Sequence, residues 1–259
     1  MTDGYRPRLL LVPGFTELEW GIRGELEEWA EVASFDMPGV GAQPLPEEID
    51  ARRGITPDLL PLWREGGVKG GLRVVDELDW EEFFIVTDTF GDPVAVRIAR
   101  ERRAAVQGLV IGHAALSHAT DGERPPTNGA VWDALTQLAR QGSEEFVRYG
   151  IAQMTQGGVS EDVARRMLER FPEMELVAVI IEALGADPEP IGDELAALDL
   201  PMLFAKHEGC LARTDEGFED AVAAFPEAET VICPGACAAS PVFADAIRGF
   251  CTGRSELRS

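Results

Sequence analysis

The chain has 259 residues, enough for one large domain or for a core with one sizeable insertion. Apolar residues make up 45% and charged residues 27% of the sequence, proportions that exclude a disordered tail, a collagen-like repeat and a small disulfide scaffold. The 46 acidic residues against 23 basic ones give a formal net charge of −23, so nucleic acid and anionic membranes are poor partners.

Hydropathy predicts neither a membrane span nor a secretory leader. No apolar stretch approaches the roughly 18 residues that a transmembrane helix needs. The N-terminus runs directly into the apolar residues 9–12 and lacks the cleavage site of a signal peptide. We therefore expect a cytoplasmic protein with four reduced, partly buried cysteines, at positions 210, 233, 237 and 251.

Short β-rich runs alternate with longer helical segments along the chain, which indicates an α/β fold: a doubly wound, mostly parallel sheet of about six strands. In chain order, strands are expected at residues 8–12, 32–36, 83–87, 106–112, 201–206 and 229–233. Helices that pack on this sheet are expected at residues 24–33, 67–78, 93–102, 215–224 and 241–251.

A long segment between the fourth and fifth strands shows no convincing strand, and helices are predicted in it near 129–140, 143–155, 160–170 and 173–184. The sequence therefore predicts a core formed by residues 1–113 and 201–259, with a helical cap inserted at 114–200. Ligands of doubly wound sheets bind at the carboxyl ends of the strands, from which this insertion emerges. The segment is therefore well placed to act as a lid.

Three motifs follow one another along the chain. Leu-Leu-Leu-Val-Pro-Gly-Phe at 9–15 is a strand with a tight turn, Asp-Met-Pro-Gly-Val-Gly at 36–41 follows the second strand, and Thr-Asp-Thr-Phe-Gly at 87–91 joins the third strand to a helix. Together they resemble the α/β-hydrolase fold family, in its oxyanion turn, its D-x-P-G-x-G loop and its nucleophile elbow. The resemblance extends over essentially the whole chain, with 114–200 in the place of the variable cap.

The resemblance implies a nucleophile at position 89 and an oxyanion hole formed by the backbone N–H groups of Phe15 and Phe90. Family hydrolases carry serine as the nucleophile, whereas this chain has Thr89 there, and Thr87 replaces the expected glycine. Threonine keeps a hydroxyl, but its methyl group restricts χ1 and crowds the turn. Some plant carboxylesterase-like dehydratases of the superfamily also carry threonine at this position, where it is thought to assist elimination.

The family's catalytic histidine follows the last strand, but residues 233–241 of this chain contain no histidine. His207 and His113 each follow an expected strand and stand at the carboxyl edge of the predicted sheet. Either could serve as a base for Thr89, or could simply be a loop or packing residue; of the two we favour His207 as the base, and we interpret His118 as structural. A standard Ser-His-Asp hydrolase is therefore not expected.

Aromatic and acidic side chains near these turns are candidates for the pocket of a small ligand. We expect Trp20 and Trp132 to line it, although tryptophans also pack cores, and Asp88 to lie beside the nucleophile. Glu17, Glu19 and Asp88 are the carboxylates nearest the elbow in sequence. Any of them could act as an acid or base if buried, and for Glu19 we expect a solvated surface charge.

No cofactor and no metal are predicted. The chain has no P-loop, and Pro-Gly-Phe-Thr at 13–16 is not the G-x-G-x-x-G turn of a dinucleotide-binding protein. Zinc is an alternative for the histidine and cysteines at positions 207, 210, 233 and 237. Their spacing matches no standard zinc motif, and buried thiols are the favoured interpretation, with a Cys210–Cys237 disulfide as a further alternative.

Two classes of function remain open. The first is an enzyme that acts on a small, largely apolar ester-, lactone-, thioester-like or carbonyl substrate, either by hydrolysis or by a non-hydrolytic step such as dehydration or cyclisation. The second is a catalytically inactive hydrolase-fold protein that binds a small molecule or a protein partner. Fold alone does not decide between them, because function resides in the site. The sequence indicates no oligomeric state.

Overall fold

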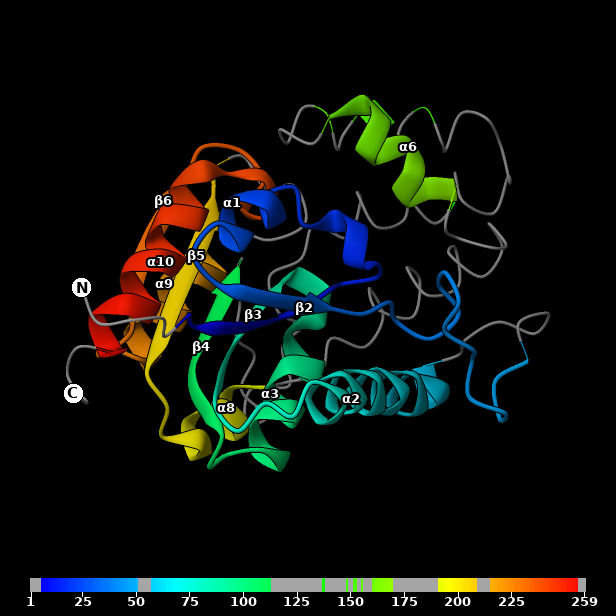
Figure 1. The fold of residues 1–259 in the computed structure, drawn as a ribbon, viewed down its shortest axis with the longest axis horizontal. Helices are drawn as coiled ribbons and strands as arrows, with labels where there is room; N and C mark the ends of the chain where they lie inside the picture. Colours follow the sequence, from blue (N-terminus) through cyan, green and yellow to red (C-terminus); the bar gives the residue numbers. More distant parts are fainter. Residues whose placement is uncertain are drawn as a thin grey trace.

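The computed structural model describes residues 6–50, 57–112, 160–169, 191–208 and 215–255, with 137, 148, 151–152 and 155 between them. The described strands form one six-stranded sheet in the order β2-β1-β3-β4-β5-β6, and all neighbours are parallel (Figure 1). They are β1 (Arg8–Val12), β2 (Glu31–Ser34), β3 (Phe83–Asp88), β4 (Val106–Gly112), β5 (Met202–His207) and β6 (Glu229–Cys233). The predicted α/β class and six-stranded parallel sheet are confirmed.

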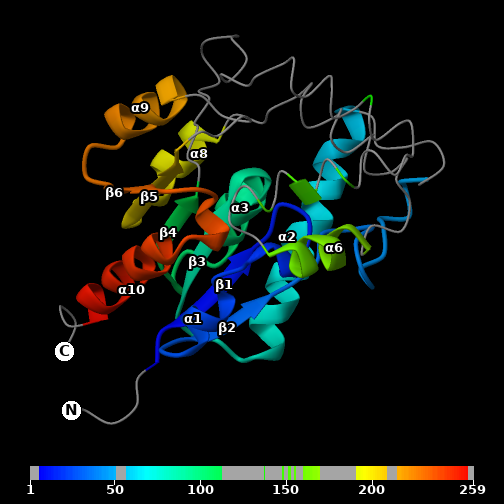
Figure 2. The same ribbon diagram turned by 90° about the horizontal axis from the view of Figure 1, so that it is seen from above.

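Helices cover both faces of the sheet (Figure 2). One face carries α2 (Leu60–Glu77), α3 (Asp92–Glu101), α8 (Gly192–Leu198) and α9 (Asp215–Ala224), and the other carries α1 (Arg23–Glu27) and α10 (Pro241–Ser255). Successive residues of a strand point to opposite faces, so a strand that is covered on both sides is apolar throughout. In β1, Leu10 and Val12 face the α2 side, Leu9 and Leu11 face the α10 side, and all four are fully buried.

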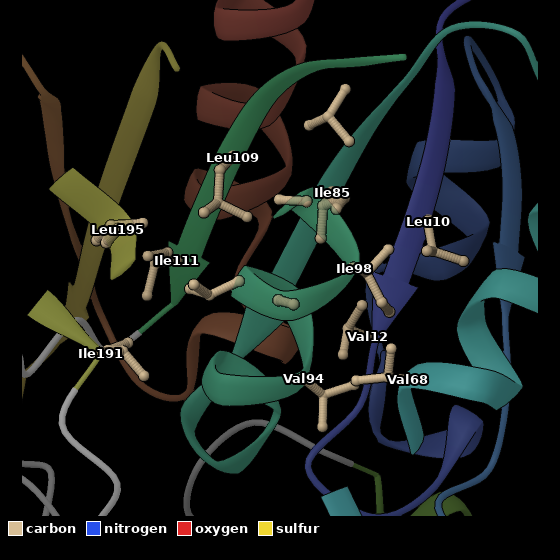
Figure 3. Close-up of a cluster of buried hydrophobic side chains, with 14 of the residues drawn as sticks. Leu10, Val12, Val68, Ile85, Val94, Ile98, Leu109, Ile111, Ile191 and Leu195 are labelled. Carbon is tan, nitrogen blue, oxygen red and sulfur yellow. The ribbon is translucent and has the colours of Figure 1, made fainter. Parts of the chain in front are cut away.

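The larger apolar core lies between the sheet and the layer of α2, α3, α8 and α9 (Figure 3). The side chains labelled in Figure 3 come from β1, β3 and β4, from α2 and α3, and from α8 with the residue before it. They are Leu10, Val12, Val68, Ile85, Val94, Ile98, Leu109, Ile111, Ile191 and Leu195. Because Ile191 and Leu195 belong to this core, α8 packs within the helical layer, although it lies inside the predicted cap segment 114–200. Most of that segment is outside the described residues, and its boundaries as a cap stay a prediction.

The turn before α3 approaches the end of β1 so closely that only glycine fits at position 91. An ideal Cβ on Gly91 would lie 2.7 Å from the carbonyl oxygen of Val12, 2.8 Å from that of Pro13 and 2.6 Å from Thr87 Oγ1. Two of these contacts are backbone atoms, so we expect Gly91→Ala to lower the free energy of unfolding by about 2–3 kcal/mol. Gly249→Ala is the control: its Cβ meets no atom within 4 Å, and its stability should change by less than about 1 kcal/mol. Urea denaturation measures both variants, and equal stabilities would contradict the tight contact.

Candidate functional site

The turn after β1 is held in place by Asp36, the acidic residue of the D-x-P-G-x-G motif. The Asp36 carboxylate accepts a hydrogen bond from the Thr16 hydroxyl (2.8 Å) and another from the backbone N–H of Glu17 (3.0 Å). These contacts fix the start of a one-turn 3-10 helix, η1 (Glu17–Glu19). Since β2 lies next to β1 in the sheet, the motif ties together the carboxyl ends of two neighbouring strands.

Glu19 folds back from η1 onto the backbone of the same turn. Its carboxyl group accepts the backbone N–H groups of Gly14, Phe15 (3.3 Å) and Thr16 (3.5 Å). The Thr16 hydroxyl in turn accepts the N–H of Leu18 (3.4 Å). Thr16 and Glu19 also form a capping box, in which the side chain of each accepts the backbone N–H of the other. The backbone N–H of Phe15, which the sequence assigns to an oxyanion hole, therefore already donates to a side chain of the protein itself.

The Glu19 carboxyl group holds its proton near pH 7. Its pKa is raised to about 8, mainly by burial; the N–H of Gly14 opposes this shift and the Asp88 carboxylate reinforces it. The group lies beside the elbow, since an ideal Cβ on Gly14 would be 3.4 Å from Phe90 Cβ and 3.6 Å from Glu19 Oε1. The expectation of a solvated surface charge at Glu19 is wrong, because the capping box turns this side chain inwards.

The predicted strand, turn and helix around the elbow are present. β3 is followed by the 3-10 turn η3 (Thr89–Gly91) and then by α3. The buried Thr87 hydroxyl donates to the Asp92 carboxylate across this turn (3.3 Å). The Thr89 side chain lies outside the described residues, so its role as nucleophile stays a prediction.

Asp88 lies beside a glycine on the neighbouring strand β4. It pairs with Gly112 of β4, and Gly112 pairs with Ala205 of β5. An ideal Cβ on Gly112 would be 3.0 Å from Asp88 Oδ1, so the glycine leaves room for the carboxylate. Since side chains alternate along β3, Asp88 shares with Phe84 and Val86 the sheet face towards α10.

Three buried polar groups gather where β6 ends. Cys233 is the last residue of this strand, and Cys237 and Ser240 follow in the next turn. A hydrogen bond with Cys237 lowers the pKa of the Cys233 thiol; Ser240 acts in the same direction, while burial and the Asp88 carboxylate oppose the shift. Asp88 therefore interacts electrostatically with both Glu19 and Cys233, and the turns after β1, β3 and β6 meet at one edge of the sheet.

A helix of the predicted cap covers this edge. α6 (Glu161–Glu169) lies apart from the helices that pack on the sheet (Figure 1) and contacts η1. Its Ala164 is fully buried and packs with Leu18 of η1 and with Ala239 of η4 (Cys237–Ala239). The helix thus bridges the turn after β1 and the turn after β6.

His207 ends β5 at the predicted edge, but one strand lies between it and the elbow strand. Because β4 separates β5 from β3, their backbones are about 10 Å apart at a spacing of about 4.8 Å between strands. His207 pairs with Cys233 in the sheet, and its Nδ1 lies 3.4 Å from the carbonyl oxygen of Glu208. Its role as a base stays a prediction. Three other residues of the predicted site and its surroundings lie outside the described residues: His113, His118 and Trp132.

Aromatic side chains form a wall next to the turn after β1. The ring centroid of Phe15 is 5.4 Å from that of Phe90 and 6.3 Å from that of Trp63. The Trp63 indole N–H donates to the carbonyl oxygen of Pro38 (2.8 Å), which fixes this wall to the D-x-P-G-x-G loop. Trp20 is 3% exposed and belongs to the apolar core on the α10 side. That it lines a substrate pocket stays a prediction.

Neither a metal site nor a membrane span is found in the part of the chain that the structure describes. No three His, Cys, Asp or Glu side chains there are arranged to hold a metal ion. The side chains of Cys233, Cys237 and Cys251 are buried, whereas Cys210 lies outside the described residues. Among the described helices, none is both long and apolar enough to cross a membrane.

Comparison with known proteins identifies the fold. No protein-family model and no curated protein matches the sequence. Solved structures match it along nearly its whole length. A carboxylesterase of Nitrososphaera gargenis is 14% identical with a TM-score of 0.70, and the match covers 99% of this chain and 93% of that one. The enol-lactonase of Burkholderia xenovorans is 17% identical with a TM-score of 0.67 (97% and 94% covered), and a haloalkane dehalogenase variant from Bradyrhizobium elkanii is 14% identical with a TM-score of 0.66 (100% and 92% covered). The chain therefore has the α/β-hydrolase fold, as its three motifs predict.

The environment of Glu19 differs from the solvated surface that its sequence position predicts. The signal that would have found it is present in the sequence as Thr16-Glu-Leu-Glu19, the S/T-x-x-E pattern of a capping box. Such a pattern directs the glutamate back onto the backbone before it, which here is the predicted oxyanion turn. The electrostatic contact between Asp88 and Cys233 has no comparable signal, because it depends on how the turns after β3 and β6 are brought together.

Proposed function

We propose that the chain is an α/β-hydrolase-fold enzyme that acts on a small, largely apolar ester-, lactone-, thioester-like or carbonyl substrate, by hydrolysis or by a non-hydrolytic step. The matching structures include a carboxylesterase, an enol-lactonase and a thioesterase domain, which supports an enzyme of this broad class. We place its activity in the cytoplasm, with a small molecule as its partner.

The observation that carries this proposal is the cluster of perturbed ionisable groups at the covered edge of the sheet. The carboxyl group of Glu19 and the thiol of Cys233 both have shifted pKa values, and both interact with Asp88. Clusters of this kind are concentrated at functional sites. The site also has the apolar wall and the few convergent polar groups that are typical of small-ligand sites: the wall includes Phe15 and Phe90.

In this proposal Thr89 supplies the nucleophilic or hydrogen-bonding hydroxyl, and His207 rather than His113 is the base. The backbone N–H of Phe90 stabilises negative charge that develops on the substrate oxygen, whereas the N–H of Phe15 is held by Glu19. Such a site lacks the tightly coupled Ser-His-Asp arrangement, so the reaction is slow compared with that of ordinary esterases of this fold.

A second candidate is a hydrolase-fold protein that binds a ligand without converting it. Two observations favour it: the Phe15 N–H is already bonded to Glu19, and the turn at 233–241 has no histidine. A protein that only binds its ligand has no need of a free oxyanion donor.

Hydrolysis of p-nitrophenyl esters from acetate to octanoate, and of γ- and δ-lactones, tests the proposal. We expect slow turnover above the spontaneous rate, and we expect Thr89→Ala to abolish it while Thr252→Ala, on an outer turn of α10, leaves it unchanged. If no substrate is turned over but one of them raises the melting temperature, the binding protein is the better description. Rapid turnover that depends on Thr89 would show that a substitute base is fully effective.

A further inference from the structure

We propose that Glu19 is the proton donor of this site: its carboxyl group contacts the carbonyl oxygen of the substrate and protonates it while the bonds at the carbonyl carbon change. This inference rests on the proposed function, since it assigns one step of that reaction. It also gives the turn after β1 a different role from the direct oxyanion hole that the sequence predicts. The backbone amides act on the substrate through Glu19.

Three backbone N–H groups hold the Glu19 carboxyl group in position. Both of its oxygens accept backbone N–H groups, one from Gly14 and the other from Phe15 and Thr16. The helical turn that carries it is in turn held by the two hydrogen bonds to Asp36. A group held in this way keeps a defined distance to a bound substrate, which proton transfer requires.

The charges around Glu19 favour its neutral form. Asp88 of β3 is the charged group that interacts with it directly, and burial acts in the same direction. On its own element, Glu17 pairs with Arg23 (3.8 Å). On α6, which packs against η1 through Ala164, two acidic residues are paired within the helix, Glu161 with Arg165 and Asp162 with Arg166. A carboxyl group with a pKa of about 8 is protonated at neutral pH and is well matched to donate a proton there.

The proton transfer conserves atoms and electrons within the site. As the oxygen of the nucleophile forms a bond to the carbonyl carbon, the electrons of the C=O π bond take the proton of Glu19. A neutral hydroxyl forms on the substrate, and the three backbone amides stabilise the carboxylate left on Glu19. When the bond to the leaving oxygen breaks, the C=O bond forms again and its proton returns to Glu19. The leaving oxygen takes the proton that the nucleophile has lost. Where Thr89 is the nucleophile, the same addition and elimination with water then releases the acyl group as an acid and restores the Thr89 hydroxyl.

The test is the hydrolysis of p-nitrophenyl butyrate by the full chain between pH 6 and pH 9.5, corrected for spontaneous hydrolysis. We expect Glu19→Gln to lower kcat by about 10²–10⁴, the range for a positioned acid, with KM changed less than about threefold. In the wild type, kcat should fall as the pH rises through about 8, and this decline should be absent from the residual activity of Glu19→Gln. Glu25→Gln, an exposed carboxylate on α1, is the control and should behave like the wild type.

The outcomes separate this inference from the proposed function. If the wild type turns over the ester and Glu19→Gln lowers kcat less than threefold without changing the pH profile, Glu19 is not the proton donor. The proposed function then still stands. No turnover by the wild type of any ester or lactone contradicts the proposed function and the role of Glu19 together. If Glu19→Gln does not fold, as judged by circular dichroism, the wild-type profile decides: a kcat that stays constant or rises through pH 9 overturns the proton donor.

Discussion

Between pH 5 and pH 9, the free energy of unfolding of the wild type should fall by about 2–4 kcal/mol more than that of Glu19→Gln. The size of this difference follows from the shift in the pKa of Glu19, since one pKa unit corresponds to about 1.4 kcal/mol. Folding raises the pKa of Glu19 from 4.5 to about 8. Between these two values the folded state keeps a proton that the unfolded chain has released. The resulting stabilisation is complete below pH 4.5 and is lost as the pH rises through 8. The lower end of the range allows for solvent screening of a partly buried carboxyl group.

The difference between the two proteins is the quantity to measure, because the net charge of −23 also makes stability depend on pH. That general effect is nearly equal in the two proteins and cancels. Urea denaturation at intervals of one pH unit gives both curves, and Glu25→Gln shows how much any exposed carboxylate contributes. Parallel curves for the wild type and Glu19→Gln would contradict a neutral Glu19 in the folded protein.

A drop in kcat of about 10²–10⁴ is the expected result of His207→Ala, with a much smaller effect on KM, if His207 accepts the proton of the nucleophile. The residue ends β5 at the carboxyl edge of the sheet, which is where the substrate is expected. His113→Ala should instead lower stability and spare kcat. The assay is the p-nitrophenyl ester hydrolysis used for the proposed function, once a substrate is in hand.

Glu208→Gln is the matched control for His207→Ala, because Glu208 is the next residue and its side chain is exposed. It should leave kcat within about twofold of the wild type. An unchanged kcat in His207→Ala, with loss of activity in His113→Ala, would reverse the two roles. Equal loss in both variants without a change in melting temperature would contradict the choice between them.

The sheet could be predicted closely because its strands are short apolar runs bounded by turn residues. The expected strands 8–12, 106–112 and 229–233 have the bounds that the structure shows, as does the helix Asp215–Ala224. For such buried parallel strands, local pattern and tertiary packing favour the same structure.

Two helices differ from the prediction for reasons that lie in packing. α2 begins at Leu60, whereas the sequence predicts its start at 67. The helix continues through its own glycines, although glycine is a weak helix former. Its glycines allow close packing: an ideal Cβ on Gly71 would be 2.5 Å from Ile98 of α3, and one on Gly67 would be 2.7 Å from Met37. The helix expected at 24–33 ends at Glu27, because the chain has to enter β2 four residues later.

The candidate site could be located from the sequence but not assembled from it. Motif order correctly puts the turns that carry Phe15 and Phe90 next to each other, and their rings are in contact. The state of Glu19 depends on burial and on Asp88, a residue 69 positions away, which no local pattern encodes. The same holds for the meeting of Cys233 with Asp88.

The most direct test of the central claim is a titration of the Glu19 carboxyl group by ¹³C NMR, in protein labelled at the glutamate side-chain carboxyl carbons. The resonance of Glu19 is the one missing from the spectrum of Glu19→Gln. A neutral carboxyl group at the turn after β1 predicts that this resonance titrates with a midpoint near pH 8. A midpoint near 4.5, the ordinary value for a glutamate, would show an ionised cap residue at neutral pH and would contradict both the proton donor and the pH dependence of stability.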